Sequence, residues 1–149
     1  MEVRVGAEAF DPGAELRDFS AGLAGAGAVV SFTGVVRGDG GLRALEIEHY
    51  PGMTESAIGE MTAQARQRFD LSAVRVIHRN GQLEVGEPIM MVLTAAPHRR
   101  AAFEAADFLM DWLKSRAPFW KKEHGPEGTA WVAAKDEDEG ALLRWGASS

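Results

Sequence analysis

Two lysines flank a short apolar turn late in the chain, and their surroundings suit them to chemistry. Lys114 and Lys121 stand on either side of the sequence Ala117-Pro118-Phe119-Trp120. An ammonium group beside desolvating aromatic side chains loses its proton more readily than one in water, which permits a lysine to act as a base or a nucleophile. The alternative is that the aromatic residues belong to the core and that the lysines are ordinary surface residues.

Positive charge is concentrated in the same part of the chain. Residues 97–122 contain six basic and three acidic residues, a net charge of +3, whereas the whole chain carries -6. His98 and Arg99 open a predicted helix here, where free backbone N–H groups and the helix dipole favour an anion. Arg37 directly follows an apolar strand. These residues predict a site for a small anion. The alternatives are that His98 and Arg99 are exposed charges at an ordinary helix start and that Arg37 is an arginine at a sheet edge.

Composition excludes several classes of protein. The 149 residues, 46% of them hydrophobic, suffice for a buried core, and we expect a single domain over residues 1–149. The absence of cysteine excludes disulfides, thiolate catalysis and cysteine-ligated metals. The acidic balance argues against nucleic-acid binding, and the histidine spacing offers no metal site. Because the sequence has neither a membrane-spanning apolar run nor a signal-peptide pattern, we expect a cytoplasmic location.

The hydrophobic pattern predicts the elements that must position these residues. Strands and helices mix without strict alternation, which favours an α+β fold, a mixed or antiparallel sheet with about three helices. Helices are expected at residues 11–23, 54–69 and 99–116. Strands are expected around Val3 and Val5 and at residues 28–36, 42–50, 74–79, 89–95 and 130–132.

For some elements the sequence also predicts the position in the sheet, the helix cap or the buried residues. The strand at residues 28–36 is nearly uncharged and is expected at the centre of the sheet. Thr54 is expected to cap its helix, His78 to be an ordinary strand histidine, and the charged run at residues 135–139 to lie in solvent. The last helix is expected to bury one stripe of residues, Phe103, Ala106, Leu109 or Met110, and Leu113.

Several motifs, in the right order over nearly the whole chain, resemble the large, catalytic subunit of molybdopterin synthase, the MoaE family. The most specific are Phe-Thr-Gly-Val-Val-Arg at residues 32–37 and Lys-x-x-x-Pro-x-Trp-Lys-Lys-Glu at residues 114–123. Residues 45–53, residues 77–81 and the pair His98-Arg99 match as well. A basic dipeptide proves little, but the two longer blocks together are specific.

The resemblance implies an α/β-hammerhead-like fold and a sulfurtransferase of molybdenum cofactor biosynthesis. Such an enzyme inserts two sulfurs into cyclic pyranopterin monophosphate and so makes molybdopterin. In the family the sulfur arrives as the C-terminal Gly-Gly thiocarboxylate of a small ubiquitin-like subunit, and the large subunit forms a homodimer at the centre of a heterotetramer. No bound cofactor is implied, because the pterin is substrate and product.

Site residues follow from the resemblance position by position. Lys114 and Lys121 match the family's two essential lysines. We expect Lys114 to act as a general acid and base or as a transient nucleophile, and Lys121 to stabilise developing negative charge. The matching substrate-binding positions are Phe32, Val35, Val36, Arg37, His98, Arg99, Lys122 and Glu123. Lys135 stands where the family often has a pocket arginine, which keeps the charge but loses the bidentate fork for phosphate.

Helix geometry adds a prediction about assembly. Arg99 and Lys114 are fifteen residues apart on one predicted helix, which separates them by about 22 Å along its axis. One chain cannot easily bring both to one small ligand, so we expect a site shared across a dimer interface. His98 and Arg99 of one subunit would face Lys114 and Lys121 of the other. The alternative function is a non-catalytic module that uses the same basic cluster to bind a phosphorylated metabolite or a partner's C-terminal tail.

Overall fold

Two four-stranded sheets and four α-helices make up the fold in the computed structural model, which describes residues 2–132 and 136–146. The strands are β1 (Glu2–Gly6), β2 (Ala28–Val35), β3 (Ala44–His49), β4 (Ala73–Arg79), β5 (Gly81–Glu84), β6 (Pro88–Ala96), β7 (Phe119–Gly125) and β8 (Gly128–Trp131). The helices are α1 (Pro12–Ser20), α2 (Met53–Phe69), α3 (Arg99–Ser115) and α4 (Asp136–Leu143), with a short 3-10 turn at Asp39–Gly41.

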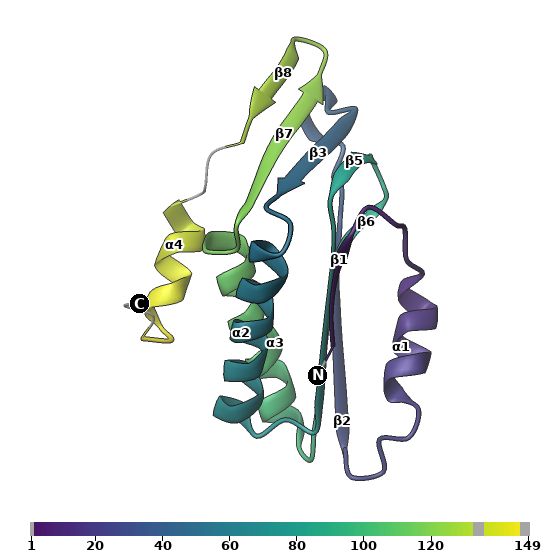
Figure 1. The fold of residues 1–149 in the computed structure, drawn as a ribbon, viewed down its shortest axis with the longest axis vertical. Coiled ribbons are helices and arrows are strands. Elements are labelled where there is room, and N and C mark those ends of the chain that lie inside the picture. The colour runs from purple at the N-terminus through teal and green to yellow at the C-terminus, as the bar shows by residue number, and fades with distance from the viewer. Residues whose placement is uncertain (1, 133–135, 147–149) are drawn as a thin grey trace.

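The first sheet is mixed and is covered on both faces. Its strand order is β1-β4-β6-β2, and only the β1–β4 pair is parallel. Helices α2 and α3 pack on one face and α1 on the other (Figure 1). Alternate residues of β6 therefore enter different cores: Val92 faces α2 and α3, and Leu93 faces α1. This double burial explains why β6 reads as a continuous apolar run.

The second sheet is antiparallel throughout and extends beyond the ends of α2 and α3 (Figure 1). Its order is β5-β3-β7-β8. Leu45, Ile47 and Leu83 bury its inner face against Val36, which follows β2. The α+β fold class is confirmed, with two sheets in place of one and a fourth helix. Within the described ranges, no helix is long and apolar enough to cross a membrane.

The expected central position of residues 28–36 is wrong, because β2 lies at the edge of the first sheet. It pairs with β6, and Val29, Phe32 and Val35 are exposed, Phe32 to 42%. An apolar, β-branched sequence indicates that side chains need covering, not how many strands flank them. In the single chain, these exposed side chains form an apolar strip along β2.

Two predictions about helices are also wrong. In the predicted stripe of α3, Ala106 and Leu109 are buried as expected, but Phe103 is 60% exposed, and Ala102 and Ala105 are buried in its place. Gly52, not Thr54, occupies the N-cap position of α2. The buried Thr54 hydroxyl accepts a hydrogen bond from the Tyr50 N–H and donates one to the Pro118 carbonyl.

The strands β5 and β7 were not predicted. In β7 the run Lys121-Lys122-Glu123-His124 has no apolar alternation, so its pairing with β3 and β8 is what reveals a strand. The charged run is helical from Asp136, where α4 begins, and its expected exposure to solvent lies outside what the structure describes.

Candidate active site

A cavity of about 380 Å³ lies where the end of α3 meets the second sheet, and both predicted lysines line it. We call it the lysine cavity. Its walls combine cationic, acidic, apolar and aromatic side chains. They include Val36, Arg37, Leu45, His78, Leu113, Lys114, Phe119, Lys121, Glu123 and Val132.

The local chain path explains why the two lysines meet. Lys114 lies on the last turn of α3, and the chain reverses at Ala117 and Pro118 before β7 begins. Lys121 then faces inward, opposite the buried Ile47 of β3. The Thr54 hydroxyl holds this reversal through its 3.1 Å hydrogen bond to the Pro118 carbonyl. Helix α2 thus fixes the turn that brings Lys114 and Lys121 to one cavity.

An apolar recess opens beside the same two lysines. It measures about 80 Å³, and Lys114, Lys121 and His78 line both it and the lysine cavity. Its remaining walls come from β2, β6 and α3: Phe32, Gly34, Val35, Ile89, Met90, Met110 and Leu113. The two ammonium groups therefore stand at the border between a polar cavity and an apolar one. Charge interactions there are stronger than in open water.

His78 is the residue of this site that the sequence did not identify. It is 4% exposed, and its ring stacks on Phe119 with 3.8 Å between centroids. Burial, helped by the charges of Lys121 and Lys114 and opposed by the hydrogen bond to the Arg79 carbonyl, lowers the pKa of His78 to about 3. The imidazole is therefore neutral at physiological pH. A histidine in an apolar strand has no sequence signal that distinguishes this role, because Phe119 lies on a distant segment.

Arg37 occupies the rim of the lysine cavity. Its guanidinium Nε is 2.7 Å from Asp39, on the glycine-rich turn that follows β2, and both side chains are largely exposed. Val36 lies beneath it and is buried. An exposed pair of this kind contributes little to stability, so an incoming anion can exchange with Asp39 at small cost.

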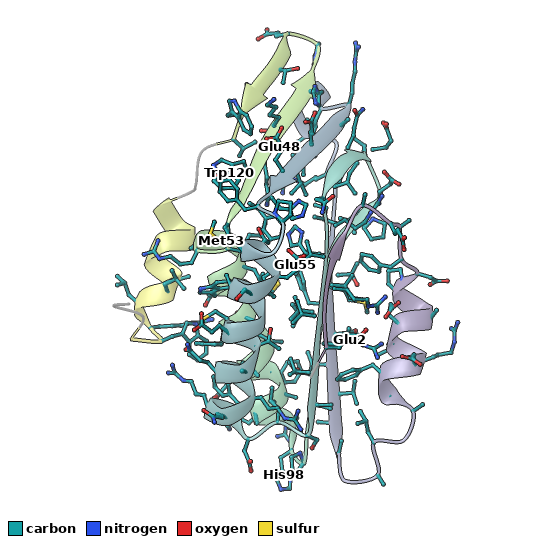
Figure 2. The ribbon with its side chains drawn as sticks, in the orientation of Figure 1. Glu2, Glu48, Met53, Glu55, His98 and Trp120 are labelled. Carbon is teal, nitrogen blue, oxygen red and sulfur yellow. The ribbon has the colours of Figure 1, made fainter. Side chains whose placement is uncertain are left out.

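His98 and Arg99 lie at the other end of α3. They line a separate surface pocket of about 420 Å³ with Arg100, Phe103 and Glu104. His98 occupies the N-cap position, and the helix separates Arg99 from Lys114 by about 22 Å. Figure 2 shows His98 at the lower end of the molecule and Trp120, the neighbour of Lys121, in the upper half. Within one chain these two groups of predicted residues do not meet.

Two further predicted positions lie elsewhere. Lys122 points to the outer face of β7, where its ammonium group lies 4.4 Å from the Trp131 ring centroid and 3.8 Å from Glu48. It lines neither the lysine cavity nor the apolar recess. Lys135 lies outside the described residues. Of the predicted residues, the chain itself gathers Lys114, Lys121, Arg37, Val36 and Glu123 around the cavity, and Phe32 and Val35 around the recess.

No group of three or more His, Asp or Glu side chains converges in a metal-ligating arrangement anywhere in residues 2–132 and 136–146. The hydrogen-bond donors that the site offers are instead ammonium and guanidinium groups. Such a donor set binds phosphate and carboxylate oxygens through charge-assisted hydrogen bonds.

Comparison with known proteins places this geometry in context. The model of the MoaE protein family matches residues 5–116. A molybdopterin synthase catalytic subunit from Cereibacter sphaeroides is 62% identical over 146 residues, covering 97% of this chain and all of that protein. The structure of a molybdopterin biosynthesis MoaE protein from Burkholderia ambifaria is 42% identical, with a TM-score of 0.85 over 99% of both chains. A complex of subunits 1 and 2 of molybdopterin-converting factor from Helicobacter pylori shares the fold, at 19% identity and a TM-score of 0.75 over 90% of each chain.

Proposed function

The chain belongs to the MoaE protein family, and on this premise we propose that it is the catalytic subunit of a molybdopterin synthase. It converts cyclic pyranopterin monophosphate to molybdopterin in molybdenum cofactor biosynthesis, by inserting two sulfurs. The observation that carries this proposal is the meeting of Lys114 and Lys121 in one cavity, beside an apolar recess.

The cavity suits both substrates of this reaction. Arg37 at the rim offers a guanidinium to the cyclic phosphate, and the apolar recess offers cover to the flat pterin ring. The carrier's terminal thiocarboxylate is an anion, and the two ammonium groups attract it. Arg99 and His98 complete the phosphate site when a second subunit supplies them.

The chemistry assigns distinct tasks to the two lysines. The thiocarboxylate sulfur bonds to a substrate carbon, and the oxygen that leaves this carbon needs a proton. Lys114 supplies that proton as general acid, or first forms a transient covalent bond to the carbon. Lys121 stabilises the negative charge that develops. Water then cleaves the acyl–sulfur bond, which frees the carrier as a carboxylate and leaves the sulfur on the pterin.

The assembly follows from the same reasoning. A small ubiquitin-like subunit with a Gly-Gly thiocarboxylate tail delivers the sulfur, and two such subunits flank a homodimer of this chain. The related complex from Helicobacter pylori, which joins two subunits, supports a small-subunit partner. The exposed apolar edge of β2 supports a chain-to-chain contact. We place the enzyme in the cytoplasm, with the pterin as substrate and no resident cofactor.

The decisive experiment mixes the protein with cyclic pyranopterin monophosphate and a thiocarboxylated small subunit and measures the dithiolene product. Lys114→Ala should lower turnover at least a hundredfold, as expected on removing a general acid or nucleophile. Arg17→Ala removes an exposed cation on α1, across the first sheet, and serves as the matched control. Near-normal turnover by Lys114→Ala would contradict its role. Binding of both substrates without product would favour the non-catalytic module.

A further inference from the structure

His78 occupies the centre of the proposed site, although the chemistry above does not use it. It projects from β4 into the space between α3 and β7 and lines both the lysine cavity and the apolar recess. Three titratable groups act on its ring, Lys121 first, then Lys114 and His49. The effect of His49 is the smallest of the three, and its Nε2 lies 3.4 Å from the Asn80 amide nitrogen.

The hydrogen bonding of the ring fixes its tautomer. The Nδ1 atom lies 2.8 Å from the Arg79 carbonyl oxygen, which can only accept. Nδ1 therefore carries the hydrogen and donates it. In a neutral imidazole the other nitrogen, Nε2, then has a lone pair and can only accept a hydrogen bond.

The ring plane is fixed as well. His78 and Phe119 stack with an interplanar angle of 18°. Phe119 and Lys121 lie on the same face of β7, two residues and about 7 Å apart. A lysine side chain of four methylene groups spans this distance. The ammonium group of Lys121 can therefore reach the edge of the imidazole that carries Nε2.

We propose that His78 is a positioning residue of this site: its Nε2 accepts a hydrogen bond from the Lys121 ammonium group and so directs it at the reacting atoms. The inference rests on the proposed function and adds a residue to it. A neutral acceptor suits this task, because a protonated histidine would repel both lysines. A carboxylate in the same place would neutralise the charge that attracts phosphate and thiocarboxylate.

Two near-isosteric variants separate this role from simple packing. In His78→Asn the amide N–H can replace the Nδ1–H donor to Arg79, but nothing replaces Nε2. In His78→Gln the amide oxygen can occupy the place of Nε2. We expect His78→Asn to lower kcat about ten- to a hundredfold with a smaller change in KM, and His78→Gln to retain more activity than His78→Asn. Equal kcat values for the two variants, or a wild-type kcat in His78→Asn, would overturn the proposal.

A second readout does not depend on turnover. An amine-reactive probe modifies only the uncharged lysine, and mass spectrometry of the full chain gives the rate at each lysine. In His78→Asn, Lys121 should be modified at lower pH than in wild type, since its charged form loses an acceptor, whereas His78→Gln should resemble wild type. Lys122, on the outer face of β7, serves as the internal reference. An unchanged Lys121 profile in His78→Asn refutes the positioning role. A changed profile in a protein that makes no dithiolene would instead reject the proposed function alone.

Discussion

A site shared between two subunits makes a quantitative prediction about mixed dimers. Arg99 and Lys114 stand at opposite ends of α3, about 22 Å apart, so each site of the proposed dimer draws them from different chains. We consider a heterodimer in which one chain carries Arg99→Ala and the other carries Lys114→Ala. In a two-fold dimer, one site then contains both substitutions and the other site contains neither.

The expected activity follows from this count. Each parent homodimer lacks one essential group in both sites and should lose at least tenfold, because a charge-assisted hydrogen bond or a general acid is removed. The purified heterodimer has one intact site, so it should show about half of the wild-type turnover. Two different affinity tags on the co-expressed chains allow the heterodimer to be isolated, and product formation is measured with thiocarboxylated carrier.

The structure provides a matched control for this experiment. Lys114 and Lys121 line one cavity of the same chain. A heterodimer of Lys114→Ala and Lys121→Ala therefore has no intact site and should stay as inactive as its parents. Activity in the control heterodimer above that of its parents would refute the shared site. So would an Arg99→Ala and Lys114→Ala heterodimer that is no more active than the mean of its two parent homodimers.

Three further predictions concern stability, each measured by urea unfolding. Because the pKa of His78 falls from 6.5 to about 3 on folding, the unfolded chain binds a proton there that the folded chain does not. The free energy of unfolding should thus decrease below about pH 6.5, by up to about 1.4 kcal/mol per pH unit, and His78→Gln should remove this part of the slope. Trp145→Phe should cost about 1 kcal/mol, since the indole N–H donates to Asp111 at 2.6 Å, whereas the exposed Trp131→Phe should cost less than about 0.5 kcal/mol. Gly27→Ala should cost about 1–3 kcal/mol, because the new Cβ would lie 2.3 Å from the Pro97 carbonyl oxygen. At Gly25 a Cβ meets nothing within 4 Å, so Gly25→Ala should be near neutral. Equal effects of the two substitutions would contradict the contact at Gly27.

Local sequence signals predicted much of the framework. Asp11 caps α1 as expected, accepting hydrogen bonds from the N–H groups of Gly13 and Ala14. The strands at 74–79 and 89–95 and the long helix from Arg99 correspond to β4, β6 and α3. These elements were predictable because their turn residues and hydrophobic periods act over a few neighbouring positions.

Predictions failed where a residue's surroundings come from distant segments. The predicted buried stripe of α3 includes Phe103, which is exposed. The alanines of α3 are buried instead, because their small side chains fit the close approach of the first sheet. Strand β7 has no apolar alternation, and hydrogen bonding to β3 and β8 makes it a strand. The residues next to them in the sequence specify neither the burial pattern of α3 nor the strand conformation of β7.

The sequence by itself determined the chemical inventory of this protein: two lysines around an apolar turn, a basic helix start, and no thiol. The lack of a thiol agrees with the proposal that the sulfur arrives on another chain. Only the tertiary structure decided which of these groups meet. The chain reversal at Pro118 brings Lys114 and Lys121 to one cavity that His78 also lines, while the length of α3 keeps Arg99 away. The physical reason is that residue types set what a side chain can do, whereas burial, stacking and distance depend on segments that only folding brings together.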